Sequence, residues 1–187
     1  MTAIVREGAK GTTEIGLESY HLMNRKIFLT GSITRESAGE FVSKLMALEA
    51  EGTEPVWVYL DTPGGEVGAG LMIYDAMNLS GVEVNVVCIG RAYSFGAVIL
   101  SSAKKGHRFL YPNAEVMIHE PLMNGLGGSA SNIKSTAETI LKVREKLNRI
   151  LAANTGKTVE EMDRETSYDH YFDAQEAVEF GLADHIC

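Results

Sequence analysis

Ser94 lies between an apolar segment, residues 84–89, and a helical pattern that begins near Gly96. A serine at a strand-to-helix junction feels the positive end of the helix dipole, and the N–H of Phe95 lies beside it. This is close to the logic of a nucleophile elbow, although Ala92 stands where that motif has its first glycine. The commoner role of a serine before a helix is to cap it. Ser94 therefore predicts acyl-transfer chemistry only if a base accompanies it.

His119 is the histidine best placed to be that base. The apolar residues 116–118 precede it and Pro121 follows, so we expect it at the end of a strand. A histidine there can exchange protons near neutral pH, and the base in turn needs an acid that fixes its tautomer. Asp169, between two expected helices, is a plausible orienting acid. The alternatives that the sequence does not separate from it are Asp61, Asp163 and Asp184.

A glycine turn can supply the electrostatic part of such a site. Thr62-Pro63-Gly64-Gly65 follows the apolar residues 56–60 directly. Glycines let a backbone or an oxyanion approach the N–H groups of a turn closely. Most Pro-Gly-Gly sequences are merely tight turns, so this motif gains meaning only beside Ser94 and His119.

Two other chemistries are disfavoured. Residues 155–158, Thr-Gly-Lys-Thr, resemble the end of a phosphate-binding loop, but Leu151 stands where that loop requires glycine. His119, Glu120, Asp169 and His170 contain no pair of ligands at helical spacing, so a metal site is a weak reading. We predict that the protein needs no metal and no other cofactor.

Composition sets the class of protein. The chain has 187 residues, of which 45% are hydrophobic and 22% charged, and this predicts one ordinary globular domain. With 17 Lys+Arg against 25 Asp+Glu the net charge is −8, which disfavours nucleic-acid binding. No apolar stretch is long enough to span a membrane. The two cysteines, Cys88 and Cys187, fit a reducing cytoplasm.

The elements that must position these residues alternate between strands and helices, which favours an α/β fold with one core. The first twenty residues predict a mobile segment or a hairpin. Short apolar runs predict strands at residues 26–29, 56–60, 84–89, 108–111 and 116–118. Helical spacing and capping boxes predict helices at residues 38–48, 67–78, 94–103 and 132–154, and helices beginning at Thr158 and Asp173.

Taken together, the motifs resemble the ClpP family, the proteolytic subunits of ATP-dependent Clp proteases. The resemblance runs from Leu29 to the C-terminus with order and spacing kept. The segments that carry it are residues 61–67, 94–97, 111–114, 117–121 and 174–184. It implies a ClpP/crotonase-like spiral of β-β-α units with a protruding long handle helix.

The resemblance also implies roles for individual residues. Ser94 would be the nucleophile, His119 the general base and Asp169 the orienting acid, this last with one extra residue in the segment 123–128. The N–H groups of Gly65 and Phe95 would form the oxyanion hole. An extended substrate would pair with the strands 66–68 and 122–127. The expected binding residues are Gly64, Glu66, Val67, Gly68, Leu122, Met123, Asn124 and Gly125. Asp61 and Glu120 are carboxylates where the family usually has amides.

At the level of assembly, the resemblance implies a homo-oligomeric tetradecamer of two stacked heptameric rings that degrades unfolded polypeptides in cytoplasmic protein quality control. Residues 1–20 would form an axial-pore segment, and residues 21–187 one protease domain whose handle covers about 122–155. A Clp-family AAA+ ATPase unfoldase would be the partner. It would dock on Trp57, Tyr59, Phe109 and Tyr111, which could equally be ordinary residues of a strand face. Two alternatives remain: a crotonase-like acyl-CoA enzyme, and a catalytically silent ring subunit.

Overall fold

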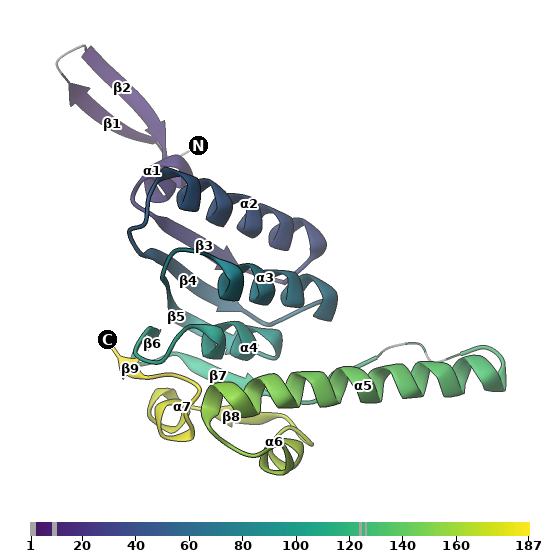
Figure 1. Ribbon diagram of the computed structural model, residues 1–187. Helices are drawn as coiled ribbons and strands as arrows, with labels where there is room; N and C mark the ends of the chain where they lie inside the picture. The colour runs from purple at the N-terminus through teal and green to yellow at the C-terminus, as the bar shows by residue number, and fades with distance from the viewer. Residues whose placement is uncertain (1–2, 9–10, 124, 126) are drawn as a thin grey trace.

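The chain folds around a mostly parallel seven-stranded sheet with helices packed against it (Figure 1). The computed structural model describes residues 3–8, 11–123, 125 and 127–187. The strand order is β3-β4-β5-β6-β9, with β7 paired to both β5 and β8. This mixed architecture confirms the predicted α/β class and is consistent with the ClpP fold.

A hairpin precedes the sheet. Strands β1 (Ala3–Gly8) and β2 (Gly11–Gly16) pair antiparallel and extend away from the other elements (Figure 1). The hairpin alternative for the first residues is therefore the observed one. Helix α1 (Leu17–Met23) follows and was not predicted. It contains no buried residue, so its sequence has no apolar stripe.

Three strand–helix units form the first part of the sheet. Their helices lie side by side on one face (Figure 1) and supply the crossovers that parallel neighbours require. In chain order the elements are β3 (Lys26–Thr30), α2 (Arg35–Glu51), β4 (Val56–Thr62), α3 (Val67–Leu79), β5 (Val84–Tyr93) and α4 (Phe95–Ser102). Strand β5 runs four residues past its predicted end at residue 89, so it leads directly into Ser94.

The second half of the chain completes the sheet at its other edge. Its elements are β6 (Arg108–Leu110), β7 (Glu115–Ile118), α5 (Ala130–Thr155), α6 (Val159–Glu165), β8 (His170–Phe172), α7 (Ala174–Phe180) and β9 (His185–Ile186). Strands β8 and β9 were not predicted, because two or three residues carry no readable alternation. No helix among the described residues is long and apolar enough to cross a membrane.

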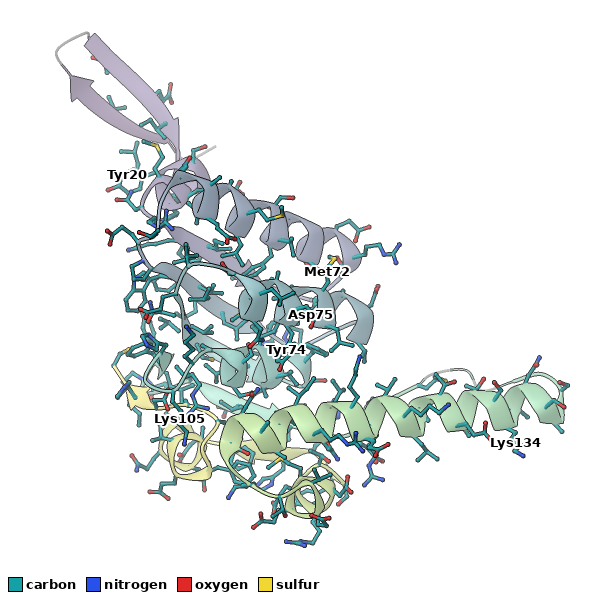
Figure 2. The ribbon with its side chains drawn as sticks, viewed as in Figure 1. Tyr20, Met72, Tyr74, Asp75, Lys105 and Lys134 are labelled. Carbon is teal, nitrogen blue, oxygen red and sulfur yellow. The ribbon has the colours of Figure 1, made fainter. Side chains whose placement is uncertain are left out.

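Helix α5 is packed at one end only. Its buried residues, Leu147, Asn148, Leu151 and Ala152, all lie in its C-terminal half. The N-terminal half projects beyond the sheet, and Lys134 near its far end lies in the open (Figures 1 and 2). At the other end Gly156, with φ 79°, closes α5, and a capping box at Thr158 starts α6. Residues 156–158 therefore connect two helices, and Thr155 is the last residue of α5.

A buried ion pair joins the C-terminal elements to the sheet. The Arg108 side chain is 2% exposed, and its Nε donates to Asp184 Oδ2 at 2.8 Å. Its Nη1 also donates to the carbonyls of Asn154 and Gly181, at the ends of α5 and α7. Burial alone would raise the pKa of Asp184, but hydrogen bonds from Arg108 and Gly106 and the charge of Arg108 lower it below 3.8.

We predict that Asp184→Asn lowers the free energy of unfolding by about 3–5 kcal/mol, because it leaves the buried Arg108 unpaired. Glu145→Gln, which removes an exposed pair with Arg149, should cost less than about 1 kcal/mol. The contribution of Asp184 is present above its unfolded pKa and is lost as the pH falls through its lowered folded value. Denaturant unfolding at fixed protomer concentration from pH 7 downwards measures both effects. Equal stability of the two variants would contradict the assignment.

Candidate functional site

Ser94 occupies a strained position between β5 and α4. Its backbone has φ 55° and ψ −118°, a combination that side-chain-bearing residues rarely adopt. The N–H of Ser94 donates to the carbonyl of Met117 at 2.8 Å, which fixes this turn to β7. Ser94 precedes α4 as its N-cap, yet its side chain makes no capping hydrogen bond. The alternative that Ser94 is only a cap is therefore wrong.

The side chain of His119 contacts Ser94 through one ring nitrogen and Asp169 through the other. The Oγ of Ser94 is 2.8 Å from Nε2 of His119, and Nδ1 of His119 is 3.1 Å from Oδ1 of Asp169. Sheet register explains the meeting. The end of β5 pairs with β7, and Ile118 of β7 is opposite His170 of β8. Ser94 directly follows β5, His119 directly follows β7 and Asp169 directly precedes β8, so the three side chains come together. The His119 side chain is 13% exposed and that of Asp169 is 58% exposed.

The three rival aspartates have other partners. Asp61 Oδ1 accepts the N–H of Arg91 at 3.1 Å, across a bulge between β4 and β5. Asp163 accepts from Asn148 at 2.6 Å, and Asp184 pairs with Arg108. Asp169 is thus the aspartate that contacts the imidazole of His119, as the resemblance implied. Among the described residues no group of three His, Cys, Asp or Glu side chains could hold a metal ion.

Two backbone N–H groups adjoin the serine. Gly65 forms an isolated parallel bridge with Ile33. The N–H of Ile33 donates to the carbonyl of Gly64, and the N–H of Glu66 donates to the carbonyl of Ile33. Successive N–H groups of an extended segment point in opposite directions, so the N–H of Gly65 points away from Ile33. Phe95 is the first residue of α4, where an N–H has no intrahelical acceptor. Both residues line the same small cavity as Ser94 and His119. Gly65 and Phe95 thus both adjoin the cavity beside the serine hydroxyl.

The glycine turn fits closely against Ser94. Gly64 has φ 90°, and a Cβ there would come within 2.7 Å of the Ser94 Cβ. Thr62, which the sequence did not single out, fixes the turn because its Oγ1 accepts the N–H of Gly64 at 3.0 Å. Thr62 is fully buried, and a polar residue that ends an otherwise apolar strand was the signal that could have revealed it.

A cavity of about 220 Å³ opens beside the serine hydroxyl. Apart from the residues at Ser94 and His119, its lining is apolar. These lining residues are Pro63, Val67, Val98, Met117, Ile118, Pro121, Leu122, Leu147 and Leu151. Such a cavity can receive an uncharged side chain next to the reacting atom.

Neither of the two segments expected to pair with substrate forms a strand in the part of it that the structure describes. Glu66 is the N-cap of α3, Val67 and Gly68 form its first turn, and the N–H of Glu66 is used by Ile33. The described residues of 119–128 follow β7 without regular structure, because here they have no partner strand. Leu122 and Met123 are exposed, and Asn124 lies outside the described residues. Substrate binding by these residues stays a prediction.

The four aromatic residues expected at a partner site do not share one contact. Trp57 and Phe109 are neighbours, with ring centroids 5.6 Å apart, whereas Tyr59 stacks on Phe28 at 5.0 Å. Tyr111 is 43% exposed just beyond β6. Trp57 and Tyr59 alternate with the buried residues of β4, so they lie on the sheet face away from the core. A larger hollow of about 830 Å³ between α1, β3 and α2 includes Phe28 but no part of the serine site.

Tyr93, which precedes Ser94, remains a neutral hydrogen-bond donor. Its hydroxyl donates to Glu115 Oε2 at 2.5 Å, and this bond, with smaller effects of burial and charge, raises the pKa of Tyr93 to about 12. Tyr93 is therefore not a competing base beside the serine.

The fold and site define an α/β protein in which the Ser94 hydroxyl is hydrogen-bonded to the His119 imidazole, and that imidazole to the Asp169 carboxylate. The family model of the Clp proteases matches residues 10–187, so the chain belongs to the Clp protease family. Membership identifies it as a ClpP-type protease subunit and implies peptidase activity. Proteases of this family generally form rings that work with ATPases.

We predict that Gly64→Ala slows the labelling of Ser94 by a fluorophosphonate at least about 100-fold, because the new Cβ displaces Ser94 from His119. The matched control is Gly39→Ala in α2, where a Cβ would meet nothing within 4 Å. Mass spectrometry of the labelled protein gives both rates. Equal rates for the two variants would contradict a tight fit between the turn and the serine.

Proposed function

We propose that this chain is a serine endopeptidase that cleaves peptide bonds of unfolded polypeptides through an acyl-enzyme. The observation that carries the proposal is the 2.8 Å contact between Ser94 Oγ and His119 Nε2, with Asp169 on the other ring nitrogen. A serine hydroxyl is a weak nucleophile without such a base, and the carboxylate holds the imidazole in the tautomer that can accept a proton at Nε2. Family membership supports the same reaction class.

In the first half of the reaction, Ser94 Oγ attacks the carbonyl carbon of the scissile peptide bond while its proton passes to His119 Nε2. Asp169 stabilises the imidazolium that forms. The carbonyl oxygen becomes negative, and the N–H groups of Gly65 and Phe95 would donate to it. Loss of one such donor costs roughly 100- to 1,000-fold in rate in comparable enzymes. Collapse of this intermediate expels the amine, which takes the proton from His119.

In the second half, a water molecule attacks the ester carbon of the acyl-enzyme and gives a proton to His119. The tetrahedral intermediate then collapses, Ser94 regains its proton, and the carboxylic acid product leaves. The apolar cavity beside Ser94 supports binding of an uncharged side chain next to the cleaved bond. No step requires a metal or a redox cofactor.

We extend the proposal to assembly on the basis of family membership. Two stacked seven-membered rings would enclose the serines, with residues 1–20 at the axial pores and the projecting part of α5 as the handle between rings. An enclosed site is safe in the cytoplasm, because only an unfolded chain delivered by a Clp-family AAA+ ATPase would reach it. The half-exposed aromatic rings of Trp57, Tyr59, Phe109 and Tyr111 are the proposed docking residues for that ATPase.

The two alternative functions have less support. A silent ring subunit would need no organised site, whereas Ser94 and Asp169 each lie within hydrogen-bond distance of His119. A crotonase-like enzyme would use the backbone donors but neither the serine nor the His119 base. Labelling of Ser94 by a fluorophosphonate separates both from a peptidase.

We predict that Ser94→Ala and His119→Ala each lower kcat for a fluorogenic peptide by roughly 10⁴-fold, because either change removes the activated nucleophile. Asp169→Asn should lower kcat less than His119→Ala, because the imidazole that accepts the serine proton is still present. Asp75→Asn, an exposed aspartate on α3 (Figure 2), is the matched control and should keep full activity. Undiminished hydrolysis by Ser94→Ala would refute the mechanism.

We further predict that native mass spectrometry shows two seven-membered rings. The assembled protein should cleave short peptides alone and degrade a folded substrate only with a Clp ATPase and ATP, because folded chains do not enter the compartment. The Ser94→Ala assembly with the same ATPase is the control. A stable, active monomer would contradict enclosure while leaving the serine mechanism intact.

A further inference from the structure

An ion-pair cluster adjoins the segment that carries His119. Glu120, the next residue, has its Oε2 3.1 Å from Nε of Arg144, which lies on α5. The Nη2 of Arg144 is 3.6 Å from Oδ1 of Asp163 and donates to the Asp163 carbonyl at 3.4 Å. Thus one guanidinium lies between two carboxylates from different segments. The Nε of Arg144 is buried, and its contact with Glu120 is ionic without good hydrogen-bond geometry.

The cluster closes on itself through polar residues. Asn148, one turn further along α5, donates to Asp163 Oδ1 at 2.6 Å and accepts from the Thr166 hydroxyl at 3.2 Å. The carbonyl of Thr166 accepts the N–H of Glu120 at 2.7 Å. Asn148 and Thr166 are at most 1% exposed. We call this ring of contacts the Arg144 cluster; its members are Glu120, Arg144, Asn148, Asp163 and Thr166.

The Arg144 cluster contacts both loops that carry residues of the serine site. One is the loop after β7, where Glu120 directly follows His119. The other is the loop before β8, where Thr166 precedes Asp169 by three residues. The two loops leave the same end of the neighbouring strands β7 and β8, where Ile118 pairs with His170. Among the described residues the cluster fastens each loop to the packed half of α5. A displacement of either loop by about 1 Å would separate the imidazole from its partners and can cost about 100-fold in rate.

We propose that Arg144 is a positioning residue of the serine site. Its guanidinium neutralises Glu120 and Asp163, which would otherwise repel each other and move the two loops apart. Partial exposure of all three side chains screens the pairing, so the effect on stability is small and the effect on geometry is the important one. This inference rests on the proposed function and adds to it a role outside the three reacting side chains.

The test compares Arg144→Met with Arg149→Met in the assembled full-length protein. Both changes remove a guanidinium from α5. Among the described residues, however, Arg149 forms an ion pair only with the exposed Glu145 of its own helix. Arg144→Met should lower kcat for a fluorogenic peptide roughly 10- to 100-fold with KM changed less than about twofold. Fluorophosphonate labelling of Ser94 should slow in parallel. Arg149→Met should match the wild type, and Arg144→Lys should recover part of the loss.

A double-mutant cycle separates charge pairing from packing. Glu120→Gln keeps the volume of its side chain and should lower kcat less than Arg144→Met does. In the Glu120→Gln background, Arg144→Met should cost less than it does alone, because the pair is already broken. Fully additive losses, or equal kcat for Arg144→Met and Arg149→Met, would overturn the proposal.

The outcomes also separate this inference from the proposed function. If the wild type neither hydrolyses peptide nor reacts at Ser94, the proposed function itself fails. If the wild type is active and the Arg144 variants are unaffected, only the positioning role fails. If Arg144→Met does not assemble by native mass spectrometry, Glu120→Gln decides, and an unchanged kcat in that variant overturns the proposal.

Discussion

The change of partner along strand β5 is the constraint on which the rest of the site depends. Residues Val86–Cys88 pair with β6, whereas Arg91–Tyr93 pair with β7. Because β7 replaces β6 at that point, His119 comes beside Ser94 rather than beyond the far edge of the sheet. The antiparallel addition of β8 to β7 then places Asp169 opposite His119. Three side chains that are 25 and 50 positions apart therefore converge without being near in sequence.

The same arrangement maintains the strained backbone conformation of Ser94. A positive φ at a residue with a side chain costs of order 1–3 kcal/mol, and surrounding contacts must impose it. Here the N–H of Ser94 is bound by Met117, and the glycine turn, fixed by Thr62, leaves no room for the serine to relax towards Gly64. The Ser94 hydroxyl is consequently held beside the His119 imidazole and against the glycine turn.

Helix α5 serves two different purposes along its length. Its packed half contributes Leu147 and Leu151 to the core and to the cavity wall, and carries the polar side chains that fasten the loops of the site. Its other half has no buried residue and leaves Leu141 58% exposed. Helices in folded proteins gain most of their stability from tertiary packing, and the contact between rings that we propose would supply such packing to this exposed half.

The sequence alone determined the α/β class, the positions of the long elements, and the roles of Ser94 and His119 as candidates, because apolar periodicity and strand-end position are local properties. It did not choose among Asp61, Asp163, Asp169 and Asp184, and only the family resemblance did so. That choice depends on which carboxylate the sheet register brings to the imidazole, a non-local property. Short strands such as β8 and the buried role of Thr62 were likewise decided by pairing and packing in three dimensions. The local sequence pattern indicates which chemical roles a residue is able to take, whereas the tertiary structure determines which residues it contacts.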